Sequence, residues 1–122
     1  MYGSIEDAIR VGLEGEILDD RGPFLRLIYQ NRPVARVVFY DQRCWALDLH
    51  HMTKSEAISA MSCFLGQIRR QSHTKCRIIT GKGIHSPKEP VLLRAAAKYL
   101  KENGLRHKLD DHGGAYDVNL KT

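Results

Sequence analysis

From residue 44 onward the sequence alternates two kinds of segment, and this alternation limits the fold more than any other feature. The runs CWALDLH (44–50) and CRIIT (76–80) are short and rich in apolar residues, which is typical of buried strands. Stretches with helical spacing follow them, over 53–70 and from about 89 to 102. A strand, a helix and a second parallel strand are joined with one hand, and the helix lies over the sheet. We therefore expect parallel strands with helices packed on them.

The first of these helices carries signals at both ends and along one face. Thr53 and Glu56 form a T-x-x-E capping box, in which each side chain satisfies an otherwise unpaired backbone N–H. Arg69 and Arg70 stand in the last turn, where cations suit the negative end of the helix dipole. We interpret its apolar stripe as a core face rather than as a groove for a cofactor or partner; the stripe consists of Ile58, Met61, Phe64, Leu65 and Ile68.

A second helix and a hairpin complete the pattern. Pro90 suits the first helical turn, and Gly104 can adopt the left-handed conformation that ends a helix. Segments 105–109 and 115–120 flank DDHGG, as in a hairpin. The predicted fold class is α/β, a two-layer sandwich with a β-α-β-α-β-β core and a mixed sheet. The residues of this second helix and hairpin that we expect to face the core are Leu93, Ala96, Ala97, Leu100, Tyr116, Val118 and Leu120.

Residues 1–43 are expected to form an N-terminal extension, and residues 44–122 the main domain. A weak helical pattern over 5–18 is interrupted by two glycines. Segments 23–29 and 34–40 fit either two strands or two short helices, and we expect a leading helix followed by strands. The parts also differ in charge: the extension has a net charge of −1 and the main domain one of +6.

Charge and cysteine content bound the class of protein. The net charge of +5 favours polyanionic partners, above all nucleic acid, although a moderately basic surface is common among proteins that bind none. Three cysteines without C-x-x-C spacing argue against a disulfide framework and a zinc site, so we expect reduced, mostly buried thiols. Neither a secretory signal nor a membrane span is recognisable. This predicts an intracellular protein, in the cytoplasm or an organelle, as a monomer or part of a larger chain.

Candidate chemistry begins at the end of the first strand. In LDLHH (47–51), alternation along the strand puts Asp48 and His50 on one face. A carboxylate two residues before a histidine can fix the tautomer of the imidazole and raise its basicity. The alternative is structural: Asp48 caps the following helix, and His50 is an ordinary residue at the sheet edge.

The second strand ends in TGKGIHS (80–86). Its glycines would let backbone N–H groups approach an anion, and Lys82 adds a positive charge. The spacing is neither GxxxxGK[ST] nor GxGxxG, which argues against a nucleoside-triphosphate site. A nest for one backbone phosphate and a turn without a ligand both fit this stretch. Because strand ends meet at one sheet edge, we expect Asp48 and His50 to lie near it.

Together the two stretches resemble the Smr, or small MutS-related, domain family. That family is marked by an LDxH motif followed further along by a [TH]GxG motif, and the resemblance spans residues 44–121. The extension IHS resembles the TGxGxHS form of eukaryotic and plant members. The family usually has glycine after the first motif, where His51 stands here; this bulkier residue could change the turn into the helix or add an imidazole. The matching residues are Leu47, Asp48, His50, Thr80, Gly81 and Gly83.

The resemblance implies a fold similar to the C-terminal domain of a bacterial translation initiation factor, and an association with nucleic acid. Several Smr domains are endonucleases acting on DNA or RNA, and others bind without cutting. Asp48 and His50 would then be catalytic, and His85 would protonate a leaving oxygen or contact the backbone. The residues expected to contact nucleic acid are Thr80, Gly81, Lys82, Gly83, Ser86 and His51.

We therefore expect a nucleic-acid-binding Smr domain that cleaves RNA, or nicks DNA, by acid–base catalysis. RNA is favoured over DNA, with a ribosome or ribonucleoprotein as a candidate partner and no membrane. The alternatives are a non-catalytic module that binds RNA or a ribonucleoprotein, and a protein-interaction domain that uses apolar residues in 24–40. No tightly bound cofactor or metal is expected, since one aspartate is a poor cage for magnesium; a requirement for divalent metal stays open.

The remaining rings are expected to be structural. Core packing is favoured over base stacking for Phe39, Tyr40 and Trp45, which stand beside the first strand. The histidines expected to be exposed are His73, His107 and His112.

Overall fold

A five-stranded mixed sheet, in the order β3-β4-β5-β7-β6, forms one layer of the protein. The structure is a computed structural model that describes residues 9, 27–29, 32–34, 38–41, 44–50, 52–81 and 91–121. The strands of the sheet are β3 (Val38–Asp41), β4 (Cys44–Asp48), β5 (Lys75–Ile79), β6 (Arg106–Leu109) and β7 (Ala115–Asn119). A separate antiparallel pair consists of β1 (Leu27–Tyr29) and β2 (Arg32–Val34).

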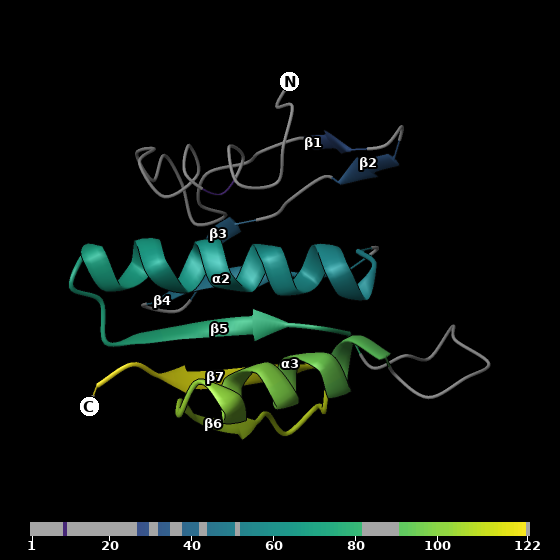
Figure 1. Ribbon diagram of the computed structural model, residues 1–122. Helices are drawn as coiled ribbons and strands as arrows, with labels where there is room; N and C mark the ends of the chain where they lie inside the picture. The colour runs from purple at the N-terminus through teal and green to yellow at the C-terminus, as the bar shows by residue number, and fades with distance from the viewer. Residues whose placement is uncertain are drawn as a thin grey trace.

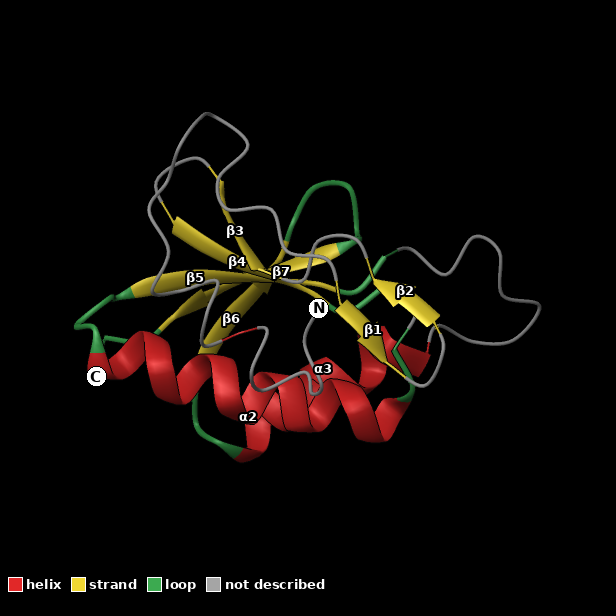
Figure 2. Ribbon diagram, turned by 90° about the horizontal axis from the view of Figure 1, so that it is seen from above, coloured by secondary structure: helices red, strands yellow, loops and turns green. Residues whose placement is uncertain are grey.

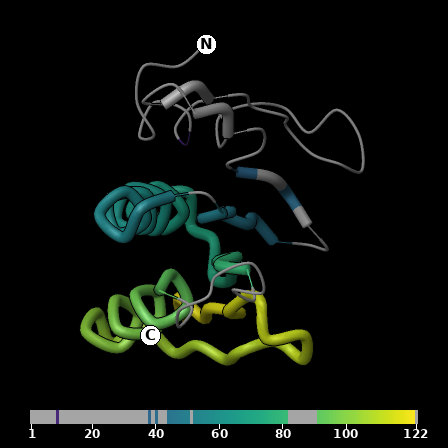
Figure 3. Tube along the Cα trace, turned by 90° about the vertical axis from the view of Figure 1, so that its right-hand side faces the viewer, coloured from purple at the N-terminus to yellow at the C-terminus, as the bar shows by residue number. Residues whose placement is uncertain are grey.

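Two helices form the second layer. α2 (Lys54–Arg70) lies between β4 and β5 in the chain, and α3 (Val91–Glu102) between β5 and β6. Figures 1 and 2 show both helices on the same side of the strands, and Figure 3 shows the layers edge-on. β4 and β5 are parallel, whereas the other neighbouring strands of this sheet are antiparallel. The predicted two-layer α/β sandwich is confirmed, and β3 adds a strand at its edge.

The local signals of α2 act as the sequence predicts. The Thr53 hydroxyl accepts the N–H of Glu56 at 3.2 Å, and the Glu56 carboxylate accepts the N–H of Thr53 at 2.7 Å, so the capping box is confirmed. At the other end Ser72 has a positive φ of 63°, and the N–H of His73 donates to the Ile68 carbonyl at 3.2 Å. This turn directs the chain back into β5.

The buried face of α2 is rotated from the predicted stripe. Ile58 is 37% exposed, so its assignment to the core was wrong. Successive residues of a helix differ by about 100° in direction, and the stripe that meets the sheet starts from Ala57, one residue earlier. The buried apolar residues of α2 are Ala57, Ala60, Met61, Phe64, Leu65 and Ile68.

The core faces of α3 and β7 agree largely with expectation. Tyr116, Val118 and Leu120 are buried, as alternation along the strand predicts. In α3 the buried residues are Ala95, Ala96 and Leu100, while Leu93 and Ala97 are partly buried against the core. Gly104 has a φ of 66° and follows α3, as predicted for the residue that ends this helix.

The part of the chain before residue 44 contributes to the same core. Ile9 is helical and fully buried, and the register of β3 pairs Val38 with Leu47 of β4. The described residues within 23–40 lie in strands, as expected, although β2 begins in the stretch between the two expected segments. The rest of the expected leading helix lies outside the described residues. The sheet therefore begins before the predicted domain boundary.

Two expectations about side chains need correction. Of the three cysteines, which form no disulfide, only Cys76 is buried, and that burial raises the pKa of its thiol to about 12. His107 is not simply exposed: its ring contacts Tyr116, and Nδ1 lies 2.8 Å from the Leu105 carbonyl oxygen. The register places His107 opposite Val118, on the face toward the helices.

The other rings follow the sequence more closely. Trp45 is buried and packs edge-on against Tyr40, with ring centroids 5.4 Å apart, so core packing is confirmed for this pair. The Phe39 side chain lies outside the described part. His112 is exposed as expected, whereas His73 is half-buried.

Candidate functional site

The carboxyl ends of β4 and β5 bring the two motifs together. The parallel register sets Asp48 beside Ile79, and the N–H of Leu49 donates to the Ile79 carbonyl at 2.8 Å. Leu47 and Leu49 are fully buried, so Asp48 and the exposed His50 use the opposite face of the strand, as alternation predicts. The acid and the imidazole therefore stand directly beside the start of the TGKG stretch.

One carboxylate oxygen of Asp48 holds His50 at two points. Asp48 Oδ1 accepts the backbone N–H of His50 at 2.9 Å and lies 2.8 Å from His50 Nδ1. An ionised carboxylate only accepts hydrogen bonds, so the ring nitrogen that faces it carries the proton and Nε2 is the basic nitrogen. The alternative in which Asp48 caps the helix is wrong, because the N-cap of α2 is Thr53.

Gly81 provides the space that the His50 ring occupies. A Cβ atom at position 81 would lie 2.3 Å from His50 Nε2 and 2.9 Å from Cδ2. Gly81 also has a φ of 80°, a conformation that side-chain-bearing residues rarely adopt. The basic nitrogen of His50 therefore lies against the Gly81 backbone; a side chain at position 81 would displace the ring, and the backbone conformation favours glycine.

The backbone of this turn is held from the other side by Gly114. The N–H groups of Thr80 and Gly81 both donate to the Gly114 carbonyl at 3.0 Å. Thr80 is 5% exposed, and its hydroxyl donates to the Gly81 carbonyl at 3.1 Å. The amide of Gly81 is thus paired within the chain rather than directed at an anion. Sequence reasoning missed Gly114 because DDHGG was interpreted only as the turn of a hairpin; its adjacent glycines were the available signal.

Asp110 and Arg77 fix the turn that supplies this carbonyl. The Asp110 carboxylate accepts the N–H of Gly114 at 3.2 Å and contacts the Arg77 guanidinium of β5. Burial alone would raise the pKa of Asp110, but the N–H of Gly114, the Arg77 charge and the N–H of Gly113 together lower it. The carboxylate is therefore kept charged where it anchors the turn beside Gly81.

The remaining candidate residues lie outside the described part of the chain: His51, Lys82, Gly83, His85 and Ser86. Among the residues that are described, no three His, Cys, Asp or Glu side chains gather as a metal ion would require. Within the same residues, neither helix has the length and apolar character needed to cross a membrane. The described site consists of Asp48, His50, Thr80 and Gly81, supported by Gly114.

Comparison with known proteins agrees with this arrangement. The Smr domain family matches residues 47–119, which include both motifs. An uncharacterized protein of Treponema pallidum (strain Nichols) is 39% identical over 72 residues, 56% of this chain and 36% of that protein, so the match spans about a third of that relative.

A solved Smr domain structure has the same fold. The solution structure of the B3BP Smr domain has 28% identity and a TM-score of 0.51 over 62% of this chain and 77% of that one. The SMR domain of NEDD4-binding protein 2 has 21% identity and a TM-score of 0.49 over 68% of this chain and 92% of that one.

Proposed function

Because this chain belongs to the Smr domain family, a family of nucleic-acid-binding and nuclease-type domains, we propose that it cleaves RNA at the edge where β4 and β5 end. The observation that supports this most is the position of His50, held by Asp48 with Nε2 against Gly81. An imidazole fixed in orientation on a partly exposed side chain is suited to moving a proton on a bound phosphodiester. The His50 side chain is 49% exposed, which leaves room for a large substrate.

In the proposed reaction the 2′-hydroxyl of the RNA is the nucleophile. His50 Nε2 takes its proton, the 2′-oxygen forms a bond to phosphorus, and the bond from phosphorus to the 5′-oxygen breaks. The 5′-oxygen then takes a proton from an acid, a role we assign to His85, and Lys82 offsets charge on the phosphoryl oxygens. The products are a 2′,3′-cyclic phosphate and a 5′-hydroxyl. Acid–base assistance of this kind contributes on the order of a hundred- to ten-thousand-fold in rate.

Labelled RNA with one deoxynucleotide at the cleavage position tests the nucleophile. We expect cleavage at that position to stop and cyclic-phosphate ends to form elsewhere, since the nucleophile is missing only there. Continued cleavage at the deoxynucleotide, or nicking of DNA at a similar rate, would show that water attacks instead. Wild-type protein that binds RNA but leaves it whole would support the non-catalytic alternative.

The Asp48→Asn variant tests the support of His50. An amide can present N–H groups to the imidazole, which removes the preference for the Nδ1–H tautomer, so we expect cleavage to fall by about a hundredfold or more. Asp111→Asn is the matched control, because Asp111 is an exposed aspartate in the β6–β7 turn. Equal rates for the two variants would remove Asp48 from the mechanism.

A further inference from the structure

The positive charge of the described residues gathers at the end of the molecule opposite His50. β5 and β6 begin at this end and β7 finishes there, since Lys75 and Arg106 both lie opposite Asn119 in the sheet. α2 runs back along β5, so its last turn reaches the same end, and Figure 1 shows the end of α3 there too. We call this the basic end; it consists of Arg69, Arg70, Lys75, Lys101, Arg106 and Lys121.

The two ends differ in their balance of charges. Two carboxylates belong to the described residues of the basic end: Asp41, which lies opposite Cys44 where β4 begins beside β5, and Glu102, which pairs with Lys98 at 3.9 Å. At the His50 end, the described part of the chain carries four acids against two cations: Asp48, Glu56, Asp110 and Asp111 against Lys54 and Arg94. Among the described residues, the attraction for a polyanion is therefore strongest at the end away from the proposed reaction.

The cations of the basic end are accessible. Arg70, Lys75 and Arg106 are exposed. Arg77, by contrast, lies further along β5 and is paired with Asp110 and Asp117, so it adds little to the attraction of an anion. The basic end thus offers solvated point charges of the kind that contact phosphate groups.

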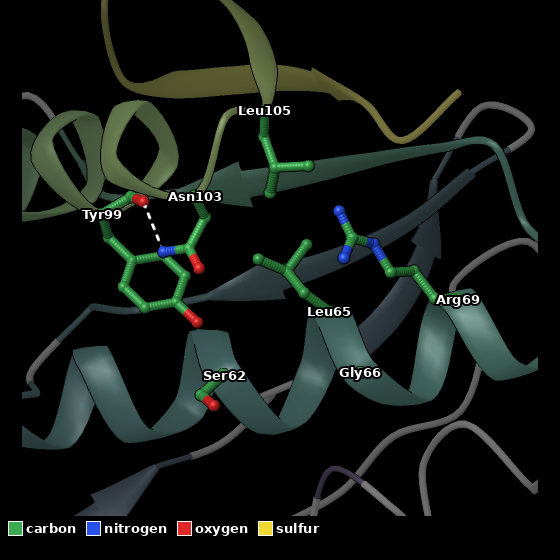
Figure 4. Close-up of a pocket in the computed structure, with 7 residues that line it drawn as sticks. All are labelled: Ser62, Leu65, Gly66, Arg69, Tyr99, Asn103 and Leu105. Atoms are coloured by element: carbon green, nitrogen blue, oxygen red, sulfur yellow. Dashed lines mark hydrogen bonds between the residues drawn. The ribbon is translucent and has the colours of Figure 1, made fainter. Parts of the chain in front are cut away.

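A pocket of about 150 Å³ opens between the helices at this end. Figure 4 shows Arg69 extending from α2 toward Leu105, across from Asn103 and Tyr99. The volume of this pocket is below that of typical small-molecule sites, which are about 300–1,000 Å³. The pocket is therefore better described as a recess in a larger basic surface than as a separate metabolite site.

We propose that the basic end is a second contact for nucleic acid, which binds the phosphate backbone of the substrate remote from His50. This inference rests on the proposed function, since it concerns the same substrate. Lys75 and Gly81 are six residues apart along an extended segment, which corresponds to about 20 Å. At about 3.4 Å per stacked nucleotide, roughly six nucleotides separate the two contacts. Binding at the basic end is independent of base sequence, because phosphate contacts do not distinguish bases.

The Lys75→Gln/Arg106→Gln double variant tests this contact with single-stranded RNA. Its control is Lys108→Gln, which removes a positive charge from an exposed residue of β6 outside the basic end. On RNA of about 12 nucleotides we expect Lys75→Gln/Arg106→Gln to bind on the order of tenfold more weakly than the wild type. The slope of log affinity against log salt concentration should become shallower by about 1.4, the value for two phosphate contacts on a single strand. The control should bind RNA within about twofold of the wild-type affinity and with the wild-type salt slope. Thermal melting checks that each variant folds.

Cleavage kinetics and RNA length separate this inference from the proposed function. We expect the basic-end variant to raise KM and leave kcat unchanged, and to have no effect on RNA of about four nucleotides, which is too short to reach both contacts. If the control loses as much affinity as the variant while the wild type still cleaves, the second contact is refuted and the proposed function stands. Tighter binding of poly-glutamate than of RNA would assign the basic end to an acidic protein. Wild-type protein that neither binds nor cleaves RNA would refute both.

Discussion

At the scale of single residues, His50 and Gly81 depend on each other. The His50 ring lies where a Cβ at position 81 would be, so the ring of the first motif takes this position because the second motif has a glycine there. This explains why neither stretch of sequence is informative alone. The LDLH stretch supplies an oriented base, and the first glycine of TGKG supplies the space beside the backbone in which that base lies.

The Gly81→Ala variant should separate this contact from backbone strain. A methyl group at this position displaces the His50 ring, so we expect cleavage to fall on the order of a hundredfold. Gly104→Ala is the control, because Gly104 also has a positive φ but no atom near its missing Cβ. Both variants should lose about 1 kcal/mol in free energy of unfolding, measured by urea denaturation. Full cleavage by Gly81→Ala would show that His50 needs no support from Gly81.

At the scale of elements, the Arg77–Asp110 contact joins β5 to the turn between β6 and β7. Because the N–H of Gly114 and the charge of Arg77 hold the folded pKa of Asp110 below its ordinary value of 3.8, these interactions stabilise the protein at neutral pH. The contribution is complete above about pH 5 and is lost as the pH falls through the lower, folded pKa.

Unfolding measured between neutral pH and about pH 2 tests that contribution. We expect Asp110→Asn to be less stable than the wild type at pH 7, and to lose less stability on acidification because the titrating group is absent. Asp111→Asn, a change at the exposed neighbour, should keep the acid dependence of the wild type. Parallel curves for the wild type and Asp110→Asn would contradict this account.

Elements could be predicted where their signals are local. The capping box at Thr53 and the alternation along β7 depend on residues a few positions apart, and both are confirmed. Ile58 was misplaced because apolar spacing defines a stripe only to within one residue, and the sheet selects the adjacent one. β3 lies largely within 34–40, where a strand was expected although a short helix also fitted; its pairing with the adjacent β4, with Asp41 opposite Cys44, decides for the strand.

At the scale of the whole molecule, the convergence of strand ends made the site predictable. Parallel strands that are neighbours finish at one edge of a sheet, so the amino-acid sequence alone is enough to predict Asp48 and His50 near Gly81. The adjacent glycines of DDHGG mark a turn, but the hydrogen bonds that Thr80 and Gly81 donate to Gly114 depend on how the β6–β7 turn meets β5, which the sequence does not specify. The separation of charge between the two ends could not be predicted either, because a net charge does not say where the charges lie. Their position follows from the fold, in which the last turns of α2 and α3 reach the same end.

The central claim is that His50 moves a proton on the phosphodiester, and a single-turnover experiment tests it most directly. Saturating His50→Ala protein is mixed with labelled RNA, and its cleavage rate and RNA affinity are compared with those of the wild type. We predict a rate at least about a hundredfold lower, with affinity within about threefold, because the chemical step loses its base while the basic end still binds. An unchanged rate, or a loss of affinity that accounts for the whole effect, would contradict the claim.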